Sequence, residues 1–205
     1  MCFAQNAIPP QQNSSSLAAL STSVTFEAKT VSNGGGVSIA AGPDTKKGFV
    51  PSSTKETRVS HPVIEVMVHN LAKQPANVHF DWFFIAASVD RKKGGNYVWD
   101  KGERDVALVA GGSNTENLVS KPLEQHTDKE SHMQTGPYTY GNGTVTGGNT
   151  MVGTLKQSGS RPEGWIVRMY VGGALVKVQA STNAFEQIAR DPVQLEKLTS
   201  AMAPR

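Results

Sequence analysis

His69 and His79 are the residues of this sequence best placed for metal chemistry. They lie in segments 63–70 and 78–88, which are rich in β-branched and aromatic residues. If these segments pair antiparallel, the two imidazoles lie directly opposite each other on one face of the hairpin. A zinc site needs three or four converging ligands, and the pairing places only these two. A metal-dependent hydrolase is therefore the least favoured hypothesis, and a solvated sheet face is the alternative.

Tyr138, Tyr140 and Asn142 form a second candidate site, in a segment that is typical of a small hairpin turning at Asn142 and Gly143. Aromatic rings stack on the C–H faces of sugars, while amides and hydroxyls exchange hydrogen bonds with sugar hydroxyls. The pattern supports a glycan-binding module, for instance one that binds mucin. An ordinary turn with exposed aromatic side chains is the alternative interpretation.

Signals for an enzyme are weak. The other three histidines, His61, His126 and His132, fall in expected loops, and none has an evident Ser or acidic partner. The glycine pairs are not followed by the helix that a phosphate-binding loop requires. We therefore expect no enzymatic activity and no cofactor.

Composition narrows the class of protein further. The 205 residues include 20 Lys and Arg against 17 Asp and Glu, and the net charge of +3 is too small to indicate nucleic-acid binding. No run of 18 apolar residues predicts a transmembrane helix. The single cysteine, Cys2, excludes a disulfide framework and any multi-cysteine metal site.

The residues around Cys2 are similar to the end of a secretory signal peptide, in which a small residue precedes the cleavage point. Cys2 is interpreted as a remnant of the signal region or as a lipidation site, with an incidental residue as the third reading. The scarcity of cysteine also suits an exported bacterial protein. We expect a periplasmic, outer-surface or extracellular location.

Periodicity predicts a mainly β antiparallel protein with a short C-terminal helical segment. Its seven or eight short strands, two hairpins and core Trp resemble an immunoglobulin-like β-sandwich. Residues 1–20 read as a flexible leader, residues 21–181 as the sandwich with an irregular insertion at 120–163, and residues 182–205 as a helical cap. Strands are expected at 21–31 and 37–40, at 63–70 and 78–88, at 106–109, and as a polar edge at 113–118. Residues 42–60 are expected to be an exposed connector.

Two tryptophans are expected in the core of this sandwich. In the hairpin of 63–70 with 78–88, Ile64, Val66 and Val68 face the side of the other strand that carries Trp82. Phe83 and Ile85 on the opposite side are expected to lie beneath the helical tail or segment 120–163.

The glycine pair at 172–173 predicts a second hairpin, formed by residues 165–171 and 174–180. Its apolar face carries Trp165, and Met169 is expected opposite Val176. Arg168 is expected opposite Lys177 on a solvated face. After this hairpin the spacing becomes helical, and Asp191 followed by proline predicts the cap of a second helix.

Residues 164–173, the following Ala180-Ser181 and the two short helices resemble exported immunoglobulin-like β-sandwich proteins of Verrucomicrobia-type bacteria, some associated with type IV pili. The resemblance covers residues 60–205 and implies no catalytic residues. It implies a non-enzymatic structural or interaction component whose partner is a protein of a pilus or envelope assembly. A glycan is the alternative partner.

Overall fold

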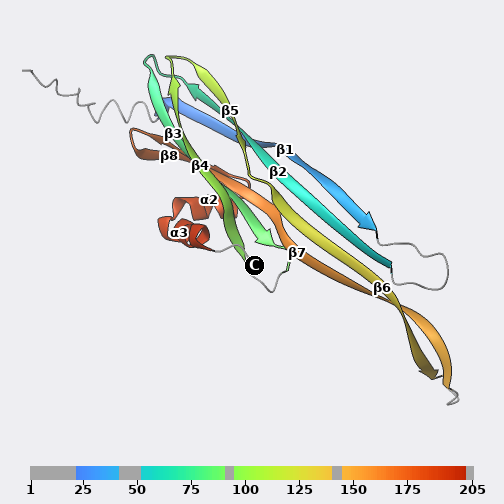
Figure 1. Ribbon diagram of the computed structural model, residues 1–205. Coiled ribbons are helices and arrows are strands. Elements are labelled where there is room, and N and C mark those ends of the chain that lie inside the picture. Colours follow the sequence, from blue (N-terminus) through green and yellow to red (C-terminus); the bar gives the residue numbers. More distant parts are fainter. Residues whose placement is uncertain (1–21, 42–51, 91–94, 140–144, 202–205) are drawn as a thin grey trace, which may run out of the picture.

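Figure 1 shows the computed structural model of the protein, which describes residues 22–41, 52–90, 95–139 and 145–201. Its strands and helices follow the chain in this order: β1 (Val24–Ala41), β2 (Ser52–Asn70), β3 (Ala76–Ser88), β4 (Asn96–Leu108), β5 (Ser113–Val119), β6 (Leu123–Thr139), β7 (Val145–Val171), β8 (Ala174–Ala180), α2 (Asn183–Arg190) and α3 (Pro192–Ser200). The expected leader and Cys2 lie outside the described residues. No helix in the described ranges is both long and apolar enough to cross a bilayer.

All the strands pair antiparallel, in one open path of order β1-β2-β6-β7-β3-β4, with β5 also on β2 and β8 also on β7. Strand β7 joins the two halves of this path because its first part pairs with β6 and its last part with β3. The mainly β antiparallel fold with two C-terminal helices is therefore confirmed. The immunoglobulin-like topology is not, since the ladders form a single open sheet.

The main hydrophobic core lies between strands from the two halves of the path. It includes Ile64, Val66 and Val68 of β2, Phe80 and Phe84 of β3, and Trp165 of β7. Trp165 is 6% exposed, and Trp82 is half-buried at the margin of the cluster. The prediction that these side chains share one core is confirmed.

The predicted hairpin of β2 with β3 is wrong. Strand β2 pairs with β1, β5 and β6, whereas β3 pairs with β4 and β7. Alternation determines which side of a strand is buried, but it does not determine which strand lies next to it. Residues 71–75 connect β2 to β3 between two ladders rather than as a hairpin turn.

The C-terminal helices cover the other side of β3. Phe83 and Ile85 are buried in a second cluster that includes Phe185 of α2 and Leu198 of α3. This confirms that the helical tail covers these positions. The predicted cap is also confirmed, because the Asp191 carboxylate accepts hydrogen bonds from the first backbone N–H groups of α3.

Long strands replace the irregular segments expected from the sequence. Strand β1 continues through the glycines at 34–36, and residues 52–60 belong to β2 rather than to a connector. Within the expected insertion at 120–163, β6 and β7 pair from Gln125 opposite Gly159 to Thr139 opposite Val145. We call residues 35–41, 52–60, 123–139 and 145–159 of β1, β2, β6 and β7 the arm, which extends beyond β3, β4 and the helices (Figure 1).

The hairpin of β7 with β8 turns at 172–173 as predicted, but its register shifts two pairs beyond the turn. Met169 lies opposite Lys177 and not opposite Val176, because one extra residue of β8 forms a bulge. The bulge reverses the faces of the following residues. Val178 therefore joins the cluster beneath the helices, while Lys177 is directed to the margin of the main core.

Candidate functional site

The structure does not bring His69 and His79 together. His69 lies on β2 between Thr25 and Ser113, whereas His79 lies on β3 in the other half of the path. Val68 beside His69, and Val78 and Phe80 on either side of His79, are buried in the main core, so the two imidazoles are directed away from it on opposite surfaces. The described residues contain no group of three or more His, Cys, Asp or Glu side chains arranged to hold a metal ion.

The predicted glycan site lies mostly outside the described residues. Tyr138 belongs to β6, where its backbone pairs with Thr146 of β7, one residue from the Gly147 that a two-residue turn at Asn142 and Gly143 would place opposite it. Tyr140 and Asn142 belong to residues 140–144, which the structure does not describe.

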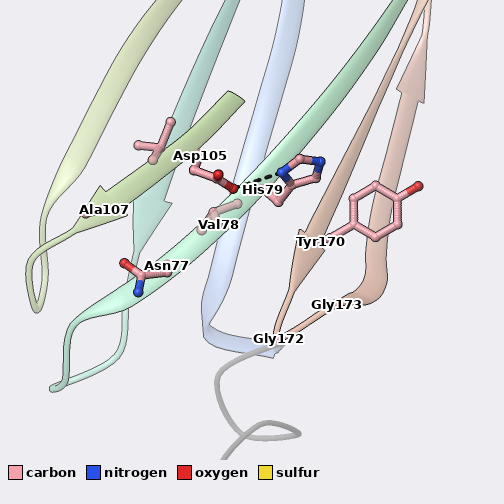
Figure 2. A pocket seen from close by; sticks show the side chains of 9 residues that line it. Asn77, Val78, His79, Asp105, Ala107, Tyr170, Gly172 and Gly173 are labelled. Carbon is pink, nitrogen blue, oxygen red and sulfur yellow. Dashed lines mark hydrogen bonds and ion pairs between the residues drawn. The ribbon is translucent and has the colours of Figure 1, made fainter. Parts of the chain in front are cut away.

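His79 instead lies at a hollow of about 550 Å³, formed where β3, β4 and the β7–β8 turn meet (Figure 2). The hollow is lined by Asn77, Val78, His79, Asp105, Val106, Ala107, Tyr170, Gly172 and Gly173. Figure 2 shows the imidazole of His79 directed toward Asp105, whose Oδ1 lies 2.8 Å from its Nδ1. The ring of Tyr170 lies on the other side of His79, with ring centroids 5.8 Å apart.

An ion pair beside this hollow fixes Tyr170 in place. The guanidinium of Arg168 binds both carboxylate oxygens of Asp81, with Nε 2.9 Å from Oδ1, and its charge faces the rings of Phe83 and Tyr170. The side chains of Arg168 and Asp81 are 18% and 17% exposed, so water screens the pair only partly. Arg168 lies opposite Val178 on β8, and the predicted opposition to Lys177 is wrong because of the bulge.

The pKa values of this group follow from its burial and charges. Burial acts to lower the pKa of Arg168, but the hydrogen bonds and negative charge of Asp81 outweigh it, and the pKa is raised. Burial raises the pKa of Tyr170, and the negative charge of Asp81 raises it further. Both groups keep their neutral-pH charge state, so the cluster is a fixed structural element.

The chemistry available at the hollow is limited. A histidine oriented by a carboxylate has the form of a general base. The described residues that line it, however, include no Ser, Thr, Cys or Lys, and the hydroxyl of Tyr170 lies 3.3 Å from Asp81 Oδ2. The lining therefore offers no nucleophile beside the base.

The arm carries a second candidate site, which the register of its four strands defines. Residues paired in register across β1, β2, β6 and β7 form a row, which we call a level. One level consists of Ile39, Glu56, Thr127 and Gln157. Val37, Arg58, Gln125 and Gly159 form the next level. Because residues two apart on a strand share a face, both levels lie on one side of the sheet. We call this side of the arm the open face.

The open face continues the side of β2 that lines the main core. Arg58 and Glu56 have the same parity along β2 as the buried Ile64. On the arm the described residues leave this side uncovered: Val37 is 51% exposed, Ile39 is 66% exposed, and Leu155, one level beyond Gln157, is 60% exposed. Three aliphatic side chains therefore face solvent on the side of the sheet that is buried elsewhere.

Two adjoining hollows lie on the open face. One of about 620 Å³ is bordered by Val37 and Arg161, and one of about 220 Å³ by Lys129 and Leu155. Arg58 and Gln125 line both hollows. The floor of the open face is thus polar and charged, and its aliphatic groups lie on the two outer strands.

The reverse face of the arm has a different character. Its levels consist of Thr57 with His126 and Ser158, and of Lys55 with Asp128 and Lys156. The Thr57 hydroxyl lies 3.0 Å from Nδ1 of His126. This polar composition is typical of a solvated sheet surface. The half-buried Val59 of β2 also lies on this side, whereas the strongly exposed Val37, Ile39 and Leu155 lie on the open face.

Sequence reasoning missed the open face. The signal that reveals it is the spacing of two between Val37 and Ile39 and between Glu56 and Arg58, which places each pair on one side of a strand. That spacing has no meaning until 52–60 is known to be a strand. Comparison of the chain with protein-family models, curated proteins and solved structures gave no significant match.

Proposed function

We propose that the protein is a non-enzymatic, exported structural or interaction component, associated with a pilus or the cell envelope, and that it binds a protein partner through the open face. The observation that supports this is the exposure of Val37, Ile39 and Leu155 on the same side of the arm, whose reverse face carries mostly polar side chains. A sheet side that lines the core in one half of the molecule is left uncovered in the other. Exposed aliphatic side chains on one side of a sheet, with charged and polar groups between them, fit a surface that another protein covers.

The composition of the open face also suits a protein partner. Its aliphatic residues flank Arg58, and arginine is enriched in interfaces because its planar guanidinium combines charge with apolar contact. The face spans four strands and its two hollows are open to solvent rather than enclosed, whereas small-molecule sites bury most of the ligand surface. Two features of the sequence support the proposed location and pilus association. One is the single cysteine, and the other is the resemblance of residues 164–173 to exported, pilus-associated proteins.

We extend the proposal to the fold. A core that includes strands from both halves of the path, with Trp165 buried in it, supports an immunoglobulin-like arrangement in which β7 connects two layers.

Photo-cross-linking in intact cells tests the proposed function. A photoreactive amino acid in place of Leu155 lies on the open face, and the matched control replaces Lys156 on the reverse face of the same strand. We expect a discrete cross-linked protein species from position 155 and none from position 156. Equal labelling from both positions, or none from position 155, would contradict the proposal.

A further inference from the structure

We infer that the partner of the open face is a second copy of this chain, related by a two-fold axis that crosses the strands at the level of Thr57. The inference rests on the proposed function, because it names the partner of the same surface. It follows from how the two levels on either side of Thr57 would meet in such a pair.

The two-fold axis places the level of Glu56 in one copy against the level of Arg58 in the other copy, and the reverse. Glu56 of each copy then faces Arg58 of the other, so opposite charges meet twice. Ile39 faces Val37 in the same exchange, so the exposed aliphatic groups of β1 cover one another. A pair with its axis along the strands would instead place β1 against β7 and Glu56 against Thr127, without these matches.

Within one chain these charges are poorly satisfied. The Nη2 atom of Arg58 lies 3.8 Å from Oε1 of Glu56, which is too long for a hydrogen bond, and the Arg58 side chain is 58% exposed. Ion pairing across the two-fold axis supplies each group with a partner, and Val37 and Ile39 of both copies cover these charges on the β1 side.

The size of the surface indicates a reversible dimer. Four strands at about 4.8 Å spacing and residues 35–41 at about 3.3 Å each give roughly 450 Å² per copy, or about 900 Å² for the pair. Interfaces of this size lie at the lower limit for specific complexes. We therefore expect dissociation in the micromolar range.

Sedimentation velocity of the purified full-length chain, at concentrations from micromolar to several hundred micromolar, measures this association. We expect a concentration-dependent dimer. Arg58→Glu and Glu56→Arg should each weaken it by at least about tenfold, because like charges then face each other twice. Lys55→Glu, on the reverse face of the same strand, is the matched control and should leave it unchanged.

Two rescue experiments separate the proposed geometry from general effects of charge. The double variant Glu56→Arg with Arg58→Glu restores opposite charges across the axis and should dimerise again. An equal mixture of the two single variants should form heterodimers, since one contributes two cations and the other two carboxylates. Circular dichroism and thermal unfolding of each variant verify that it is folded.

The outcomes also distinguish this inference from the proposed function. A chain that stays monomeric at every concentration, or a double variant and mixture that fail to associate, would overturn the two-fold dimer. If position 155 nevertheless cross-links to a different protein in cells, the proposed function stands with another partner. If neither association nor cross-linking occurs, both fail.

Discussion

Lys177 of β8 donates a hydrogen bond to the backbone carbonyl oxygen of Phe26 on β1, at 2.9 Å, although the two strands do not pair. The same ammonium group lies 5.4 Å from the centroid of the Phe26 ring. Two residues further along each strand, the backbone N–H of Ala28 donates a hydrogen bond to Oε1 of Gln179 at 2.5 Å. Two side chains of β8 thus satisfy backbone groups on the outer edge of β1, which would otherwise be open to another strand.

Replacement of Lys177 tests this bridge. Lys177→Met keeps the aliphatic stem but removes the hydrogen bond and the cation above the Phe26 ring. We expect a loss of about 1–2 kcal/mol in the free energy of unfolding, measured in urea. Lys197→Met on the exposed surface of α3 is the control, and a loss of the same size there would show that the bridge contributes nothing.

Asn70 anchors the passage from β2 to β3. It is fully buried, its Nδ2 donates to the carbonyl oxygens of Gln74 and Val109 at 2.9 and 3.0 Å, and its Oδ1 accepts from the Ala72 N–H. We expect Asn70→Leu to lower the free energy of unfolding by about 2–4 kcal/mol, because three backbone groups, each in a partly buried hydrogen bond, lose their partner. The measurement is denaturant unfolding.

The isosteric Asn70→Asp sharpens the test of this anchor. A carboxylate keeps the acceptor but offers no donor to Gln74 and Val109, and its charge is buried. We expect it to be destabilised at neutral pH at least as much as Asn70→Leu. A stability equal to that of the parent protein would mean that the loop does not depend on this side chain.

Gly159 marks the point where β7 leaves β6 and begins to pair with β3. Its φ of +86° lies in the left-handed region, and a Cβ atom there would lie 2.4 Å from the carbonyl oxygen of Glu124. We expect Gly159→Ala to reduce the free energy of unfolding by about 1–3 kcal/mol. Gly153 on the same strand is the matched control, since a Cβ there meets nothing closer than 3.8 Å. Thermal unfolding of the two alanine variants should differ clearly, and equal midpoints would contradict the role of Gly159.

Alternation of apolar residues correctly predicted which sides of β2 and β3 are buried, and capping chemistry correctly predicted α3. Neither signal names a neighbouring strand, and this is why the hairpin of 63–70 with 78–88 was wrong and His69 and His79 proved to lie apart. Which side of a strand is buried follows from the local alternation of residues. Which strand lies next to it depends on the set of ladders that together bury the most apolar surface.

The arm could not be predicted because the usual strand signal depends on burial. Within the described residues no second layer packs on the strands of the arm. Polar residues therefore occupy positions on both of their faces, and the segments 52–60 and 123–139 read as loops. The sequence also gives no signal for the bulge at Val176, because β8 presents apolar residues whether or not the register shifts there. The open face, which depends on the arm, was therefore inaccessible to sequence reasoning.

The raised pKa of Tyr170 predicts how stability responds to alkaline pH. Burial and the charge of Asp81 disfavour the phenolate, so the folded chain holds this proton more tightly than the unfolded chain, whose tyrosines titrate near 10.0. Stability from this group is complete below that pH and is lost as the pH rises above it. We expect the free energy of unfolding of Tyr170→Phe to fall less steeply above pH 10 than that of the parent protein, and the most alkaline phase of tyrosinate absorbance to disappear. Parallel pH profiles for the two proteins would show that Tyr170 ionises as freely in the folded state as in the unfolded one.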